Sequence, residues 1–322
     1  MNQQQHPRPL RVGILGHYHG ENLGDEVMVA SLIRNIRMRR PEAEIFGVSL
    51  RPADTSVRHG IPAVSMATGT QYREGEKVPG RDADASPLGR VAAALEDAEA
   101  TSLRRAGGKM HSLASLLRTV QTLHGADMLI VAGSGPLFDG WKGPWVHPFN
   151  LFKWSVVAWA THTAFVPLSV GAGPIDAPLS RFFVRWALET AYYRSFRDPG
   201  SVELVEALGV TGRNPIFPDL GFSLPDDELA PRRGAAATRE GVVGISTVAH
   251  QDPRYLPGGD AQKYRAYLEK LTAFAAQLLE RGYTLHLLRS QVEADERVAT
   301  DLQNRLRAAG VDLDDRIVAA PT

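Results

Sequence analysis

The sequence predicts an α/β protein built from two Rossmann-like domains. Short apolar runs alternate with helical amphipathic patterns along most of the chain, which is the order typical of parallel sheets covered by helices. A polar stretch at residues 226–240, which contains Pro231 and Gly234, separates two such series. We therefore assign residues 8–225 to an N-terminal domain, 226–240 to a linker and 241–322 to a C-terminal domain.

Composition limits the classes of function. A chain of 322 residues is long enough for two domains, at about 150 residues per domain. The 36 Lys and Arg residues balance 36 Asp and Glu residues, so the net charge offers no global attraction to nucleic acid or to an anionic membrane, and any anion site must be local. The chain has no cysteine, which excludes disulfides, thiolate catalysis and zinc sites of the cysteine type. Its polar N-terminus lacks the apolar core of a secretory signal, so we expect a cytoplasmic location.

The most informative stretch is residues 13–26, where an apolar strand leads through a glycine-rich bend into a helix. Gly16 and Gly20 allow a tight turn, and Asp25 stands in the first helical turn, where the helix dipole favours an acid. Arginines precede Pro41 at the other end of this helix, which is the expected pattern of a helix terminus. The stretch is therefore a strand, loop and helix unit with a bend large enough for a ligand.

The rest of the N-terminal domain continues the alternation. Residues 67–86 have few apolar side chains, so we expect a mobile loop there. Residues 155–175 are long and apolar enough to imitate a membrane span, but they contain prolines and glycines, so we expect a buried strand at 164–170 instead. The other expected strands are 44–50, 57–64 and 126–132, and the other expected helices are 88–106, 111–123, 180–193 and 202–208.

The C-terminal domain is a second alternating series. We expect strands at 242–248, 284–288 and 316–320, and helices at 263–281 and 293–309. Three parallel strands make a short sheet for an independent domain. We therefore expect this domain to be an incomplete version of a longer one.

Glycine-containing turns follow two of the predicted strands. Gly133, Ser134 and Gly135 follow the strand at 126–132, and Gly171 and Gly173 follow the strand at 164–170. Ligands of open α/β sheets bind at the carboxyl ends of the strands, and glycines there let a sugar or a phosphate approach the backbone.

Aromatic residues follow the first of these glycine turns. Trp141 and Trp145 lie in a loop rich in Gly and Pro beside the glycines and are candidates for stacking on a sugar ring. The later aromatics at 149, 152, 154 and 159 repeat at helical spacing and are expected in the core.

Two charged residues have both a functional and a structural interpretation. Arg197 stands at a junction between a strand and a helix, where it either binds an anion or pairs with Asp198 or Asp219. Asp25 either orients or deprotonates a substrate hydroxyl, or only stabilises its own helix. His17 and His19 are spaced to point the same way, but the sequence offers no third ligand near them, so we predict no metal site.

Taken in order, these motifs resemble the polysaccharide pyruvyltransferase family over most of the chain. The residues that carry the resemblance are Gly16 to Glu26 with Asn22-Leu-Gly24-Asp25-Glu26, the turn Gly133 to Phe138, Gly171-x-Gly173-Pro174, Arg197-Asp198-x-x-Ser201 and Asp219-x-x-Phe222. The second glycine of the first loop stands one place later than the family pattern, at Gly20, and Ser134 is a further mild departure.

The resemblance implies a fold, a reaction and a set of site residues. It implies a GT-B-like arrangement with the active site in the cleft between the domains. It also implies transfer of a pyruvyl group from phosphoenolpyruvate, as donor substrate and without a cofactor, to two sugar hydroxyls as a cyclic ketal. We expect catalytic roles for Asp25 and Arg197. Substrate contacts are expected from Asn22, Gly24, Gly133, Ser134, Gly135, Trp141, Gly171, Gly173, Ser201 and Asp219.

One departure from the family leaves other functions open. The family has an Arg-x-His segment later in the second domain, which supplies a donor-binding arginine and a catalytic histidine, and no counterpart follows Asp295 before Thr322. A GT-B nucleotide-sugar glycosyltransferase and a carbohydrate-binding protein without catalysis are therefore the alternatives. The expected partner is a carbohydrate or glycolipid acceptor, with no nucleic acid, at most peripheral contact with a membrane, and a homo-oligomer as one option.

Overall fold

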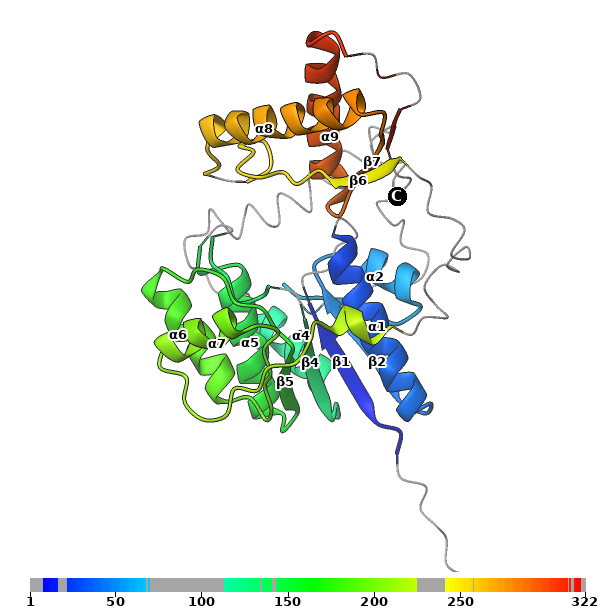
Figure 1. Cartoon of the computed structure of the whole chain (residues 1–322). Coiled ribbons are helices and arrows are strands. Elements are labelled where there is room, and N and C mark those ends of the chain that lie inside the picture. The colour runs from blue at the N-terminus through cyan, green and yellow to red at the C-terminus, as the bar shows by residue number, and fades with distance from the viewer. Residues whose placement is uncertain are drawn as a thin grey trace, which may run out of the picture. The chain divides into compact units, whose positions relative to one another are not determined.

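A computed structural model describes residues 8–16, 22–67, 69, 113–133, 135–140, 143–224, 241–256, 258–311, 313 and 316–319. They belong to two compact units, the first made of residues 1–20 and 25–223 and the second of residues 21–24 and 224–322. Each unit contains a parallel sheet with helices (Figure 1). The predicted α/β class is therefore confirmed. The predicted helix at 88–106, the linker at 226–240 and all but two residues of the predicted loop at 67–86 lie outside the described residues.

The first unit is built on a five-stranded sheet of order β3-β2-β1-β4-β5. Its strands are β1 (Arg11–Leu15), β2 (Glu44–Ser49), β3 (Ala63–Ser65), β4 (Met128–Ala132) and β5 (Ala164–Leu168). All neighbouring strands are parallel. The order changes direction between β1 and β4, which makes the carboxyl ends of these strands the expected ligand edge of a doubly wound fold.

The two faces of this sheet pack on two separate hydrophobic cores. Val12, Ile14 and Ile130 pack with residues of α1, whereas Leu15 and Leu129 pack with residues of α5 on the other side. Because both faces are covered, the strands are almost continuously apolar. The helices of the unit are α1 (Leu23–Arg39), α2 (Pro52–His59), α4 (Leu113–Leu123), α5 (His147–Ala160), α6 (Pro178–Glu189) and α7 (Pro199–Ala207), with the short 3₁₀ helix η2 (Leu220–Ser223).

Two predictions in this unit were wrong. The expected strand at 57–64 is mostly the end of α2, and β3 begins only at Ala63. Pro52 at the helix start and the left-handed Gly60 at its end explain this short helix. The expectation that the later aromatics are core holds for Trp154, which is fully buried, but not for Trp159, which is 67% exposed. Phe149 and Phe152 are half-buried.

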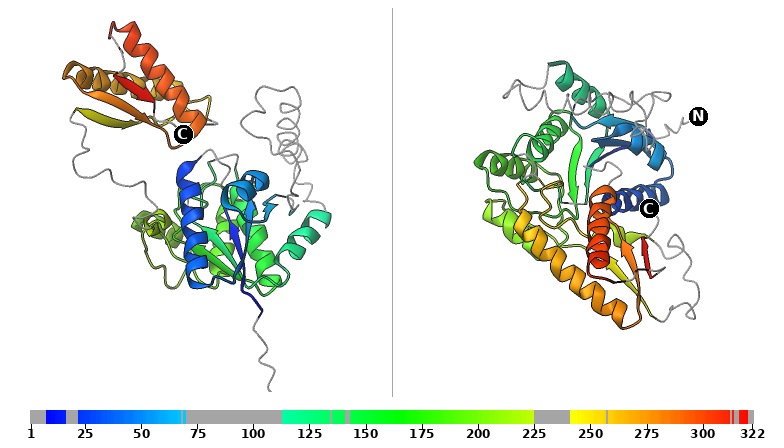
Figure 2. Two further views of the ribbon diagram at one scale, coloured as in Figure 1. Left: turned by 90° about the vertical axis from the view of Figure 1, so that its right-hand side faces the viewer. Right: turned by 90° about the horizontal axis from the view of Figure 1, so that it is seen from above.

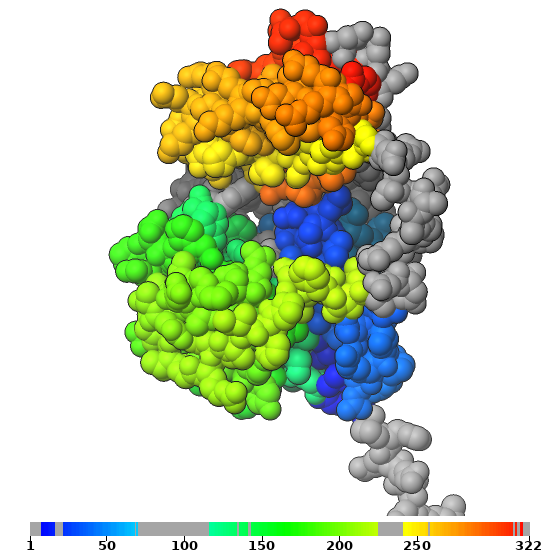
Figure 3. All heavy atoms as spheres, in the orientation of Figure 1, coloured from blue at the N-terminus to red at the C-terminus, as the bar shows by residue number. Residues whose placement is uncertain are grey.

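The second unit has a three-stranded parallel sheet of order β6-β7-β8. Its strands are β6 (Val242–Ser246), β7 (Thr284–Leu288) and β8 (Ile317–Ala319), and its helices are α8 (Ala261–Glu280) and α9 (Val292–Ala308). Ile245, Leu285 and Leu287 are buried with α8 and α9, while the residues between them are half-buried or exposed. Helices α8 and α9 pack on one another. The gold and orange atoms of this unit are contiguous in the space-filling view (Figure 3), and Figure 2 shows the unit from two further sides.

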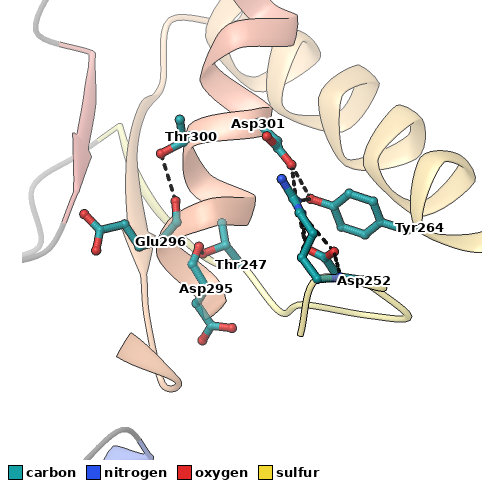
Figure 4. A network of polar contacts seen from close by, with 8 residues as sticks. Thr247, Asp252, Tyr264, Asp295, Glu296, Thr300 and Asp301 are labelled. Carbon is teal, nitrogen blue, oxygen red and sulfur yellow. Dashed lines mark hydrogen bonds and ion pairs between the residues drawn. The ribbon is translucent and has the colours of Figure 1, made fainter. Parts of the chain in front are cut away.

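Buried carboxylates fix the loops that follow β6 and β7. Asp295 Oδ2 accepts hydrogen bonds from the backbone N–H groups of Ser290 and Gln291, both at 2.8 Å. Asp252, 1% exposed, binds the guanidinium of Arg254, which also reaches Asp301. Figure 4 shows Asp252, Tyr264 and Asp301 converging beside α8 and α9, with Asp295 apart from them. Asp252 is paired with a cation and Asp295 is satisfied by neutral hydrogen-bond donors, as carboxylates at low exposure usually are.

None of the helices in the part of the chain described here combines the length and the apolar character that a membrane crossing requires. The run at 155–175 instead supplies the end of α5 and the whole of β5.

Candidate functional site

The candidate site lies at the carboxyl edge of the first unit's sheet, which irregular strands extend beyond β5. Val170 pairs in parallel with Phe196, and Phe196 pairs in parallel with Ile216. The residues that follow these three pairing positions therefore leave the sheet at the same edge. They include Gly171 and Arg197, each one position later, and Asp219, three positions after Ile216.

Arg197 lies directly against the backbone of Gly171. A Cβ atom built on Gly171 would lie 2.6 Å from Nε and 2.7 Å from Cζ of Arg197. The guanidinium thus occupies the space that any other side chain at position 171 would need. The predicted glycine turn and the predicted cation therefore form one local arrangement.

Two carboxylates flank this guanidinium at long range. Arg197 Nε lies 3.5 Å from Asp198 Oδ2, and Arg197 Nη1 lies 3.5 Å from Asp219 Oδ2. The Arg197 side chain remains 38% exposed. Bonds between a guanidinium and a carboxylate are normally about 2.7 to 2.9 Å long, so these contacts are weak. Arg197 keeps donor capacity and exposure for an external anion, although both of the ion pairs considered as structural alternatives exist.

Asp198 and Ser201 hold the backbone on both sides of Arg197. Asp198 caps α7 by accepting a hydrogen bond from Ser201 N at 2.7 Å, and this bond is the first cause of the lowered pKa of Asp198. The Ser201 hydroxyl, 1% exposed, accepts a bond from Ala172 N at 2.8 Å. Ser201 therefore ties the start of α7 to the turn under Arg197. A direct contact between Ser201 and substrate stays a prediction.

The same edge is connected to the start of α1 through η2. A Cβ on Gly221 would lie 3.5 Å from Val27 Cγ1, and Gly221 N donates to Asp219 Oδ1 at 2.9 Å. Figure 1 shows η2, in yellow-green, beside α1. Gly133, with φ +44°, is packed against Met28 of α1. The segment of Asp219 and Gly221 thus contacts α1 through Gly221 and Arg197 through Asp219.

The start of α1 has the form that its sequence predicts. Asn22 Oδ1 accepts a hydrogen bond from Gly24 N at 3.0 Å, as an N-capping residue does. Asp25 is half-buried in the first turn. Residues 21–24 belong to the second unit, in which Asn22 forms an antiparallel bridge with Gln291. Asn22 and Gly24 therefore have structural contacts of their own, and their binding roles stay predictions.

The remaining predicted residues fall into two groups. Gly173 N donates to Leu137 O at 2.8 Å, while a Cβ on Gly135 would meet nothing within 4 Å. Ser134 and Trp141 lie outside the described residues, as do His17 and His19. In the ranges that the structure describes, no group of three or more His, Asp or Glu side chains is arranged to hold a metal ion.

Sequence reasoning missed the part played by Val27, Met28 and Gly221. The local pattern of Val27 and Met28 is that of an apolar helix face. Nothing in it says that Val27 meets Gly221 or that Met28 meets Gly133. Gly221, two residues after Asp219, was the available signal, since its amide reaches back to the Asp219 carboxylate. This local turn holds one Asp219 oxygen and leaves the other toward Arg197.

A comparison with models of protein families shows to which family this chain belongs. The model of the family described as polysaccharide pyruvyl transferase matches residues 22–319, which include Asn22, Asp25, Arg197 and Asp219. The chain belongs to the polysaccharide pyruvyl transferase family. The match spans both units, so the family assignment concerns nearly the whole sequence. A comparison with curated proteins gave no match.

Solved structures give a broader likeness. Anabaena HepE in complex with UDP has 12% identity and a TM-score of 0.47, over 96% of this chain and 68% of that one. The UDP-GlcNAc 2-epimerase of Methanocaldococcus jannaschii has 9% identity and a TM-score of 0.48, over 97% and 74%. The S. aureus MnaA structure with UDP has 10% identity and a TM-score of 0.49, over 98% and 69%.

Proposed function

We propose that this polysaccharide pyruvyl transferase family member moves a pyruvyl group from phosphoenolpyruvate to two hydroxyls of a glycan or glycolipid sugar, forming a cyclic ketal and phosphate. The observation that carries the proposal is the position of Arg197. Its guanidinium is partly exposed at the carboxyl edge, rests on Gly171 and contacts carboxylates only at 3.5 Å. Membership of the family supports the reaction class.

The donor is the substrate that Arg197 suits. Phosphoenolpyruvate carries a phosphate and a carboxylate, and a planar guanidinium binds either group through two parallel hydrogen bonds. Such bonds to charged groups contribute about 1.5 to 3 kcal/mol each. In this proposal the donor anion replaces Asp219 as the partner of Arg197 Nη1, which requires little displacement because that contact is 3.5 Å long.

The acceptor is assigned to the start of α1. Asp25 stands in the first turn of this helix, and Val27 of the next turn packs on the segment that holds Asp219. A carboxylate there can accept the proton of a sugar hydroxyl or orient it. Ser134 and Trp141 remain proposed as sugar contacts from the loop that follows β4.

The chemistry has two additions at one carbon. A proton added to the methylene carbon makes it a methyl group and leaves positive charge at C2, where the first hydroxyl oxygen forms a bond and loses its proton. The C2–O bond to phosphate then breaks, phosphate leaves with the electron pair, and the second hydroxyl adds and loses its proton. Arg197 stabilises negative charge that grows on the departing phosphate.

The direct test measures phosphoenolpyruvate binding and phosphate release by the whole chain, with a glycolipid acceptor. Arg197→Met is expected to abolish donor binding, because it keeps an unbranched side chain but removes the guanidinium and its charge. Arg213→Met is the matched control, since Arg213 is an exposed arginine of the same unit. Circular dichroism of both variants would show whether the fold is retained.

Three other results would remove the proposal. Equal donor binding by the Arg197→Met variant would take Arg197 out of the site. Release of a nucleotide from a nucleotide sugar, without use of phosphoenolpyruvate, would replace pyruvyl transfer by glycosyl transfer. Stabilisation by a glycan, with no binding or turnover of either donor, would identify a carbohydrate-binding protein.

A further inference from the structure

Five aromatic side chains from α5, α6 and the turn just before α5 form a chain of ring contacts, which we call the aromatic face: Trp145, Phe149, Phe152, Phe182 and Trp186. The distance between ring centroids is 5.5 Å for Trp145 and Phe149, 6.5 Å for Phe149 and Phe152, 5.8 Å for Phe152 and Phe182, and 6.1 Å for Phe152 and Trp186. The face belongs entirely to the first unit. It lies over the green helices α5 and α6 of Figure 1.

These rings are not the core of the unit. Trp145 is 56% exposed, Phe182 52% and Trp186 38%. The core is reached one layer further in, at Phe183, which is 5% exposed and contacts the ring of Phe152 at 4.8 Å. Large exposed aromatics that touch one another form a contiguous apolar patch, and such patches mark interaction sites.

Helix α6 is apolar on two opposite sides. Its inner side buries residues 183, 184, 187 and 188, while Leu179, Phe182 and Trp186 are exposed on its outer side. A surface helix normally turns a polar face to water. The three exposed apolar residues of α6 therefore indicate that this side of the helix contacts an apolar partner.

The exposed charges of α6 are two arginines and one glutamate. Arg181 and Arg185 are both exposed on α6, and Arg185 is paired with Glu189 at 3.2 Å. Within the described residues, no carboxylate lies within ion-pair distance of Arg181. α5 contains no acidic residue at all. An exposed cation therefore borders the rings, and the only acid on the two helices is already engaged.

Exposed aromatic rings beside an exposed arginine favour one kind of binding partner for the aromatic face over another. A second copy docking through the same patch would offer Arg181 only Glu189 of its α6, and that carboxylate is already paired with Arg185. Trp and Phe together with Arg are instead the residues of interfacial helices, whose rings enter the headgroup region while the cations meet anionic lipids. We propose that the aromatic face docks on the surface of a lipid bilayer that contains anionic lipids.

The test is cosedimentation of the full chain with phosphatidylcholine vesicles, with and without phosphatidylglycerol. The wild type is expected to sediment with the anionic vesicles, and Phe182→Ser/Trp186→Ser is expected to lower the bound fraction by about tenfold. Phe274→Ser is the matched control, because Phe274 is 51% exposed on α8 of the other unit. Thermal unfolding and circular dichroism would verify that each variant is folded.

A second variant keeps the test decisive if the double variant fails to fold. Arg181→Glu leaves every ring in place and is expected to remove the preference for anionic vesicles. Absence of wild-type binding to either vesicle would overturn the proposal, and so would unchanged binding by both variants. A dimer in light scattering that the double variant abolishes, without vesicle binding, would assign the face to a second copy. Lipid docking does not depend on pyruvyl transfer, since vesicle binding is measured without donor or acceptor.

Discussion

The guanidinium of Arg197 occupies the space beside Gly171 that a side chain would fill, with Nε only 2.6 Å from the position of a built Cβ. The relationship arises because Val170 and Phe196, the residues just before them, pair in parallel. Gly171 is therefore part of what positions Arg197. The consequence is that a small change at position 171 can displace the cation without removing it.

Gly171→Ala is expected to weaken phosphoenolpyruvate binding by about tenfold or more, since a misplaced guanidinium loses part of its bidentate contact. The fold is expected to survive, because the colliding atoms belong to the movable end of a side chain. Titration of the donor and a thermal melt would measure the two effects.

Gly200→Ala is the matched control for that substitution. Gly200 lies in the first turn of α7, just after Arg197, but a Cβ there would meet only Asp198 Oδ1, at the ordinary contact distance of 3.5 Å. Unchanged donor binding by Gly171→Ala, or equal losses in both variants, would contradict a positioning role for Gly171.

Ser201→Ala is expected to lower the free energy of unfolding by about 1 to 2 kcal/mol, since it leaves the N–H of Ala172 without its acceptor. The bond is 2.8 Å long and Ser201 is 1% exposed. Donor binding is expected to weaken as well, because Ala172 follows the glycine that supports Arg197. Urea unfolding would give the first quantity, with Thr190→Ala as control, whose hydroxyl bonds the backbone at an exposed position. Equal losses of unfolding free energy in the two variants would contradict a role of the Ser201 hydroxyl in holding the turn at Ala172.

The parts of this fold that the sequence predicts best are its buried strands. β1 and β4 are short apolar runs bounded by turn residues, and parallel strands covered on both faces have this composition. β3 was harder, because the eight residues of α2 are too few to show a helical period and Ile61 alone suggested a strand. Periodicity also identified the helix that carries Trp154 and Trp159. It could not say which ring faces the core, since that depends on which side of α5 packs against the sheet.

The candidate site was predictable in its parts and not in its assembly. Glycines after strands and an arginine at a junction are visible in the sequence, and the sheet topology brings Gly171, Arg197 and Asp219 to one edge. The steric fit between Arg197 and Gly171 depends on a pairing between irregular segments outside the named strands. No local pattern encodes such a pairing, so the sequence alone could not give it.

Lys153 provides a prediction of pH dependence. Its ammonium is 6% exposed and donates to Met66 O at 2.7 Å and to Ala67 O at 2.8 Å. Burial lowers the pKa of Lys153 from 10.5 to about 7. Above that pH the unfolded chain binds a proton that the folded chain has lost. The contribution of this group to stability therefore rises with pH until the unfolded pKa is reached.

Lys153→Met removes this proton linkage. We expect the stability of the wild type relative to this variant to increase by about 1.4 kcal/mol per pH unit between about pH 7.5 and 9.5. Urea unfolding of both proteins at several pH values measures the difference, and Lys263→Met, on an exposed lysine, is the control. Parallel pH profiles for the wild type and Lys153→Met would show that Lys153 titrates as an ordinary lysine.

Tyr264 tests the network that fixes the loop after β6 in the second unit (Figure 4). Its hydroxyl donates to Asp301 Oδ2 at 2.6 Å and accepts from Arg254 at 3.0 Å. Burial, followed by the bond to Asp301, raises the pKa of Tyr264. Tyr264→Phe is expected to lower the free energy of unfolding by about 1 to 2 kcal/mol, because the lost bond has a charged acceptor.

The loss is expected to be limited to that size because Arg254 still bonds Asp301 and Asp252 in the variant. Asp252→Asn should cost more, since it removes the charge that meets Arg254 at a site only 1% exposed. Hydrogen exchange of residues 252–264 locates either effect, and Tyr283→Phe, at a tyrosine 37% exposed in the same unit, is the control. The contrary result would be equal exchange rates for these amides in the Tyr264→Phe and Tyr283→Phe variants. The conformation of the loop would then depend on Gly259 and the left-handed Gln251 rather than on the network.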